Sequence, residues 1–254
     1  SALTLNIENA ALLEEANRQQ LAAEQANADK SRLFAAVSHD LRQPLYAMGL
    51  VLETLGERLN SHEQRKLHDD IGRMHEAITE MFNAVMDVSQ LDSVSVQVNI
   101  VDCELSSLIS GLVAEFTPSA EQKSLEFIFN RDECWGRVDP VLLSRVLRNL
   151  ISNSIKFSDS GQIRIEIERS TEGILLSVVD SGCGIPEKER THIFTEYYQL
   201  SNPTRDRTKG LGLGLAVVDR LCRLMEIPIS VVSTPGVGSR FTLQISPGDK
   251  PTVG

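Results

Sequence analysis

The chain has 254 residues, of which 41% are hydrophobic and 24% charged, and its formal net charge at pH 7 is −10. This composition is typical of a folded globular protein and excludes overall disorder. Nucleic acid is excluded as a partner, because binding it requires a basic face that neutralises phosphates. No apolar run approaches the roughly 20 residues that span a bilayer. We therefore expect a cytoplasmic fragment without membrane contact, whether or not the full-length protein is membrane-anchored.

The N-terminus lacks the basic-then-apolar order of a signal peptide, and the sequence begins with a helical composition. We therefore expect a fragment of a longer protein. The four cysteines contain no C-x-x-C pair and are far apart, which argues against a zinc site or a disulfide framework. We expect free, buried thiols at Cys103, Cys134, Cys183 and Cys222.

Residues 31–92 have the periodicity of two helices. Apolar side chains recur every three or four residues from Phe34 to Leu59 and again from Leu67 to Val88. Between them, Ser61 and Gln64 form a capping-box pattern that predicts the start of the second helix. Two helices alone cannot enclose a core, so this hairpin predicts a homodimer that forms a four-helix bundle. Residues 1–30 predict a helix that is either a marginal coiled coil or a solvated single helix.

Residues 96–248 alternate between short β-branched runs and helical stretches, and the boundary between the two halves falls near Leu91–Val94. This pattern predicts an α+β chain whose second part is an α/β sandwich with one mixed sheet covered by helices. The Asp139-Pro140 pair predicts a helix start, with an acceptor at the cap and proline in the first turn. The sequence predicts strands at 96–101, 125–129, 162–169, 174–180, 229–233 and 240–245, and helices near 104–122, 140–157 and 212–226.

A first candidate site is the sequence Ser38-His39-Asp40-Leu41-Arg42-Gln43-Pro44-Leu45. His39 lies off the apolar stripe, and a neutral imidazole is nucleophilic at physiological pH. Asp40 supplies a carboxylate that can orient one ring nitrogen. Pro44 weakens the helix one turn later, because it cannot donate to the carbonyl of Asp40. An exposed histidine beside an aspartate is also common as a solvated surface pair.

Three further motifs lie in the second half. Asn149, Asn153 and Lys156 share one helix face, where amide oxygens can bind Mg²⁺ and a lysine can meet phosphate, although an ordinary polar face has the same pattern. Asp180 ends an apolar strand and is followed by Gly182 and Gly184, which suits either an adenine amine or a simple glycine turn.

The last motif, Gly210-Leu-Gly212-Leu-Gly214, opens a helix, and a helix N-terminus can bind phosphate. It matches neither the Walker nor the Rossmann pattern. The polar segment 201–209 before it, with Lys209, is read as a mobile lid or as a solvated loop.

Together these motifs resemble those of bacterial sensor histidine kinases of two-component signalling. The phosphoacceptor box corresponds to 38–45, the N box to 149–156, the first glycine box to 180–184, the F box to 193–198 and the second glycine box to 210–215, and Gly236–Phe241 also matches. The resemblance covers residues 30 to 246 and implies a Bergerat-type (GHKL) ATP-binding domain after the dimeric hairpin.

The resemblance also implies roles. His39 is expected to be the phosphoacceptor, Asp40 the acid that activates it, and Asn153 the Mg²⁺ ligand, with Asn149 one turn before it. Lys156 is expected near the phosphates and Asp180 at the adenine amine, while the glycines shape the pocket and the lid. Phe194 is expected to couple the lid to the bundle. The implied cofactors are ATP and Mg²⁺, and the implied partners are a second copy and a response regulator receiver domain, in cis or in trans.

The sequence departs from many relatives at Gln43, where Thr or Asn serves in dephosphorylation of the regulator, so we expect weak phosphatase activity. The phosphoacceptor box resembles that of hybrid kinases, which carry a receiver domain after the core. We further expect 91–96 to act as a hinge.

Two alternatives remain open on sequence alone. One is a degenerate dimeric modulator of another kinase. The other is a different ATPase, or a Ser/Thr kinase, of the same nucleotide fold.

Overall fold

The computed structural model describes residues 18–20, 25, 41, 43–56, 59, 61, 63–72, 74, 75, 78, 79, 82, 97–171, 173–200 and 212–250. The chain divides into two compact units, Ser1–Val96 and Gln97–Gly254. Several predicted features lie outside the described residues: His39, Asp40, Lys209, Gly210, the lid at 201–209, the hinge at 91–96 and most of 1–30.

The first unit contains the predicted helical hairpin. Helical residues 41 and 43–56 belong to the first hairpin helix, and helical residues 63–72, 74, 75, 78, 79 and 82 belong to the second. Ser61 N donates to Gln64 Oε1 and Gln64 N donates to Ser61 Oγ, both at 3.2 Å, which confirms the capping box. Leu67, Ile71 and Met74 expose 61%, 43% and 65% of their surface within the single chain. These apolar side chains therefore lack a complete core within one copy.

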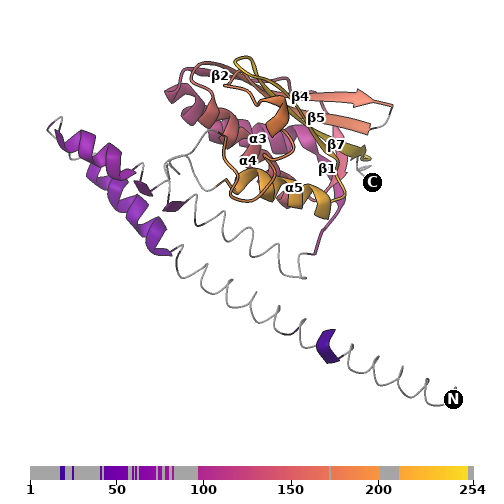
Figure 1. Cartoon of the computed structure of the whole chain (residues 1–254), viewed down its shortest axis with the longest axis horizontal. Coiled ribbons are helices and arrows are strands. Elements are labelled where there is room, and N and C mark those ends of the chain that lie inside the picture. The colour runs from indigo at the N-terminus through magenta and orange to yellow at the C-terminus, as the bar shows by residue number, and fades with distance from the viewer. Residues whose placement is uncertain are drawn as a thin grey trace. The chain divides into compact units, whose positions relative to one another are not determined.

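The second unit is one sheet with helices on one face (Figure 1). Its strands are β1 (Val101–Glu104), β2 (Leu125–Phe129), β3 (Trp135–Val138), β4 (Gly161–Ser170), β5 (Gly173–Asp180), β6 (Ile229–Thr234) and β7 (Gly238–Pro247). Its helices are α3 (Leu105–Gln122), α4 (Pro140–Phe157), the short 3₁₀ helix η1 (Glu187–Glu189) and α5 (Gly214–Leu224).

The strand order is β1-β3-β7-β5-β4-β2, with β6 also paired to β7. The β2–β4 pair is parallel and the other pairs are antiparallel, so the sheet is mixed. In the β5–β7 pair, Asp180 lies opposite Ser239, which brings the end of β5 beside the β6–β7 turn. The fold class predicted from the sequence is confirmed.

The core forms between the sheet and the helices. Ile163 and Leu243 are fully buried and alternate along their strands with less buried neighbours, and Leu176 of β5 is fully buried too. Helix α4 contributes Leu143, Leu147, Leu150 and Ile151, spaced at three and four residues, which gives it one apolar face. Asp139 Oδ1 accepts from the backbone N–H groups of Val141 and Leu142, so the predicted helix start is confirmed.

The second unit differs from the sequence predictions in three respects. The predicted strand at 96–101 is absent at 97–100 and begins only at Val101, because Asn99 N donates to the cap carboxylate of Asp139 at 2.9 Å instead of to a strand. Strand β3 was not predicted, since a four-residue segment containing Gly136 has little local strand signal. Of the four cysteines expected to be buried, Cys134 and Cys222 are, but Cys183 is exposed and Cys103 only partly covered.

Within the described part of the chain, no helix is both long and apolar enough to cross a membrane.

Candidate nucleotide site

The polar face of α4 and the start of α5 meet through a glycine. The ideal Cβ position on Gly214, the first residue of α5, lies 3.1 Å from Asn149 Oδ1 and 4.0 Å from Asn153 Oδ1. A side chain at Gly214 would therefore crowd the amide oxygen of Asn149, and it would lie in ordinary van der Waals contact with the amide of Asn153. The structure brings Asn149 and Asn153 to the N-terminus of α5, where backbone N–H groups favour negative charge.

Lys156, the third residue of the predicted face, is at the last turn of α4. Its Nζ lies 5.9 Å from the ring centroid of Phe157, and its own backbone carbonyl accepts from Lys123 Nζ at 3.2 Å. Lys123 Nζ also bonds the carbonyl of Ile155 at 2.9 Å, so it caps the helix C-terminus. The described contacts place Lys156 beside Phe157 and not in contact with the asparagines.

Asp180 ends β5 with its carboxylate held by the backbone. Oδ1 accepts from Gly182 N at 2.9 Å and from Ser239 N at 3.2 Å, while Oδ2 has only a long contact of 3.5 Å from Ser154 Oγ. Burial raises the pKa of the Asp180 carboxyl, and the N–H donors oppose that rise. Oδ2 therefore keeps acceptor capacity for a ligand amine.

The turn after Asp180 packs too closely for side chains. A Cβ on Gly182 would lie 2.5 Å from the carbonyl oxygen of Phe157. Gly184 has φ +69°, and its Cβ would collide with the carbonyl of Thr234 at the end of β6. Gly236 N donates to the Cys183 carbonyl at 2.8 Å, which ties the two turns together. Glycine is required here by backbone packing.

The F-box segment contacts the second glycine box. Tyr197 N donates to the Gly212 carbonyl at 3.1 Å, and a Cβ on Gly212, which has φ +72°, would lie 2.6 Å from the Tyr198 carbonyl oxygen. Tyr197 itself has φ +61° and exposes 66% of its surface. A bulky residue in that conformation is strained, and such strain is concentrated at functional sites. Phe194 lies three residues earlier and is half-buried.

Sequence reasoning did not assign three serines around Asp180. The hydroxyl of Ser154 and the backbone N–H of Ser239 donate to its carboxylate. Ser154 lies inside the N box and Ser239 inside the segment Gly236–Phe241, so these two motifs were the sequence signal that could have indicated them. Ser158 Oγ is buried and has no hydrogen-bond partner among the described residues, and it lies 2.9 Å from the ideal Cβ position on Gly182. A buried hydroxyl without a partner is costly, so this corner suits a polar ligand or a bridging water.

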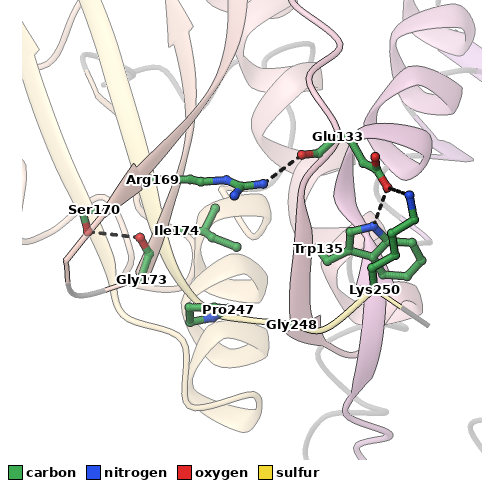
Figure 2. Close-up of a pocket in the computed structure, with 9 residues that line it drawn as sticks. All are labelled: Glu133, Trp135, Arg169, Ser170, Gly173, Ile174, Pro247, Gly248 and Lys250. Carbon is green, nitrogen blue, oxygen red and sulfur yellow. Dashed lines mark hydrogen bonds and ion pairs between the residues drawn. The ribbon is translucent and has the colours of Figure 1, made fainter. Parts of the chain in front are cut away.

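A separate cavity of about 410 Å³ lies where β5 begins, seven residues from Asp180 (Figure 2). Trp135 Nε1 donates a hydrogen bond to Glu133 Oε1 at 3.1 Å, and Lys250 Nζ forms an ion pair with the same oxygen at 2.7 Å. Arg169 donates to the backbone carbonyl of Glu133 at 3.0 Å. No residue of the glycine boxes or the N box lines it. These contacts fasten the chain after β7 to β3 and are not part of the nucleotide site.

Comparison with known proteins identifies the class of both parts. The family model described as "Histidine kinase-, DNA gyrase B-, and HSP90-like ATPase" matches residues 138–249, and the one described as "His Kinase A (phospho-acceptor) domain" matches residues 29–94. The fold and site of the second unit thus define an ATP-binding domain of that class.

Curated sensor proteins are similar to the chain over most of its length. The chain is 31% identical over 227 residues to "Sensor histidine kinase RcsC" of Escherichia coli (strain K12), which covers 88% of this chain and 24% of that protein. It is 34% identical over 238 residues to "Aerobic respiration control sensor protein ArcB" of the same organism, covering 91% and 30%. The chain therefore contains the ATPase and phospho-acceptor domains of the two family models and is similar over most of its length to these sensor proteins, while it spans only 24% and 30% of their length.

Solved structures agree on the fold. The full-length ShkA structure in complex with AMPPNP has a TM-score of 0.67 at 23% identity and covers 87% of this chain and 47% of that one. The histidine kinase AdeS of Acinetobacter baumannii has a TM-score of 0.55 at 19% identity and covers 83% and 98%. These likenesses show the fold alone, whereas the resemblance drawn from the motifs is confirmed by the two family models and the curated relatives.

Proposed function

We propose that this chain uses Mg-ATP to phosphorylate its own His39 and then passes the phosphoryl group to an aspartate of a response regulator receiver domain. The observation that carries the proposal is the geometry of Asp180. Two backbone N–H groups fix one oxygen of its half-buried carboxylate and leave the other to accept a hydrogen bond from the exocyclic amine of adenine. This arrangement selects an adenine nucleotide over ligands that lack such a donor.

The phosphate end is proposed to lie at the junction of α4 and α5. The N-terminus of α5 favours negative charge, and Gly214 leaves the space beside the asparagines open. The amide oxygens of Asn153 and Asn149 suit Mg²⁺, which prefers oxygen ligands and would neutralise phosphate charge there. Lys156, Lys209 and Gly210 are proposed to complete the site together with Gly212.

The acceptor is proposed to come from the first unit, which belongs to the phosphoacceptor family. His39 would attack through one ring nitrogen while Asp40 holds the other, so that the nucleophile is neutral and oriented. Phosphoryl transfer requires little covalent chemistry from the protein, so positioning of His39 dominates. Phe194 is proposed to couple the lid to the bundle, and the segment 91–96 is proposed to be the hinge about which the ATP-binding domain moves toward His39.

The hairpin is proposed to dimerise. Leu41, Met48 and Leu55 of the first hairpin helix and Leu67, Ile71 and Met74 of the second are all exposed in one copy. Burial of these side chains against a second copy is the usual solution for a two-helix hairpin. The proposed recipient of the phosphoryl group is a receiver domain, either in cis or in trans. The proposed site of action is cytoplasmic, where ATP is available.

Incubation with γ-labelled ATP and Mg²⁺ tests the proposal. We expect acid-labile, base-stable label that is absent from His39→Gln, and transfer of that label to a receiver domain. Nucleotide binding without label would contradict the kinase proposal and favour a dimeric modulator of another kinase.

A further inference from the structure

Two histidines of the second hairpin helix bond the backbone of the first. His75 Nε2 lies 2.7 Å from the carbonyl oxygen of Leu45, and His68 Nε2 lies 2.8 Å from that of Leu52. The two histidines are seven residues apart on the second helix, and the two leucines are seven residues apart on the first. The two contacts therefore repeat with the heptad of an antiparallel hairpin. Both rings are half-buried.

Two glycines make room for these rings. A Cβ on Gly49 would lie 3.2 Å from Cε1 of His75, and a Cβ on Gly56 would lie 3.1 Å from Cε1 of His68. Each glycine follows the bonded carbonyl by four residues, so it is the residue whose N–H meets that carbonyl in an α-helix. The ring therefore sits where a side chain is missing and adds a second donor to an oxygen with two lone pairs.

The chemistry of the acceptor fixes the state of the ring. A carbonyl oxygen only accepts, so Nε2 must carry a proton in both histidines. At His68 the other nitrogen, Nδ1, lies 3.3 Å from Asp69 Oδ1. The two contacts are thus directional hydrogen bonds, which specify register more narrowly than apolar packing does.

The two contacts differ in their position along the first helix. Leu45 directly follows Pro44 and comes six residues after His39, whereas Leu52 lies one heptad farther away. Proline cannot donate to the carbonyl four residues earlier, so we expect the helix to be weakest just before Leu45. The bond from His75 is made at the first carbonyl after that weak point.

We propose that His75 is a positioning residue for phosphoryl transfer. Its bond to Leu45, admitted by Gly49, holds the turn after Pro44 against the second hairpin helix and thereby fixes the direction of the segment that carries His39. This rests on the proposed function, in which His39 is the phosphoacceptor. His68 and Gly56 form the same contact farther from His39 and serve register only.

The matched contact supplies the control. In the full chain, His75→Leu and His68→Leu each remove one such bond, so we expect similar losses of melting temperature and an unchanged KM for ATP. Only His75→Leu should slow autophosphorylation at saturating ATP, by about tenfold, or about 1.4 kcal/mol of barrier. His75→Gln, whose amide nitrogen can donate, should recover most of the rate.

A second pair of variants, at the two glycines, tests the proposal even if one of the leucine variants fails to fold. Gly49→Ala and Gly56→Ala both improve helix propensity, so neither should unfold the hairpin. We expect Gly49→Ala to slow labelling by displacing the His75 ring, and Gly56→Ala to leave the rate within twofold. Equal slowing in both members of each pair, or slowing in neither, would overturn the proposal while leaving the kinase intact. Absence of label from the wild type would refute the proposed function and this inference with it.

Discussion

Replacement of Asp180 by Asn should separate nucleotide binding from stability. The amide oxygen of Asn can still accept from Gly182 N and Ser239 N, so the turn after β5 should persist. The NH₂ group of Asn, however, takes the place of Oδ2. It would face the exocyclic amine of adenine, and because both groups are donors, no hydrogen bond can form between them. A hydrogen bond to a charged group contributes about 1.5–3 kcal/mol. At 1.4 kcal/mol per tenfold, Kd for a non-hydrolysable ATP analogue should rise by about 10- to 150-fold.

The same substitution should not lower the thermal stability of the protein, although it weakens nucleotide binding. Burial raises the pKa of Asp180 in the folded protein, so at neutral pH the ionised form is disfavoured there relative to the unfolded chain. Removal of the charge should leave the melting temperature unchanged or higher. Calorimetric titration and thermal unfolding measure the two effects, with Ser154→Ala as a control for the long 3.5 Å contact. Unchanged Kd, or loss of affinity accompanied by a large loss of stability, would refute the assigned role.

Three further predictions follow from other parts of the molecule. Leu147→Ala removes a fully buried side chain from α4 and should lower the free energy of unfolding of the second unit by about 2–5 kcal/mol in urea titration; a smaller loss would contradict the core assignment. The hydrogen bonds to the Leu52 carbonyl and to Asp69 raise the pKa of His68 above 6.5. The stability that the protonated ring contributes is therefore fully present below pH 6.5, and it is lost as the pH rises through the pKa of the folded state. The difference in melting temperature between wild type and His68→Leu should therefore shrink above pH 6.5, and a difference that grows would contradict this. Gln43 is exposed on the first hairpin helix. We expect the wild-type chain to dephosphorylate a phosphorylated receiver slowly, and we expect Gln43→Asn to accelerate that reaction. Rapid, His39-independent dephosphorylation by the wild type would disprove this.

Local chemistry explains what the sequence could predict. Helix α4 was predicted with its observed bounds because Asp139 caps it and Pro140 begins it, and its apolar face has a helical period. The long strands were predicted within one or two residues from their β-branched runs. Strand β3 was missed because its extended state comes from pairing with β1 and β7, which are remote in sequence.

The candidate site was predictable only in part for the same reason. Asp180 was evident from its place after an apolar strand, but its second backbone donor comes from Ser239, 59 residues later. The roles of Gly49 and Gly56 were also hidden, because a glycine inside a helix reads locally as a weak point. Only contact with histidines 26 and 12 residues farther along shows why glycine stands there.

The position of the phosphoryl group on the chain tests the central proposal most directly. Trypsin cleaves after Arg32 and Arg42, so His39 is released in the peptide Leu33–Arg42, which contains no other histidine. After reaction with Mg-ATP and digestion at neutral pH, mass spectrometry should find one added phosphoryl group on this peptide, lost on brief acid treatment. Phosphoryl label on a peptide with His62, His68, His75 or His192 instead, or acid-stable label on Ser38, would contradict the account.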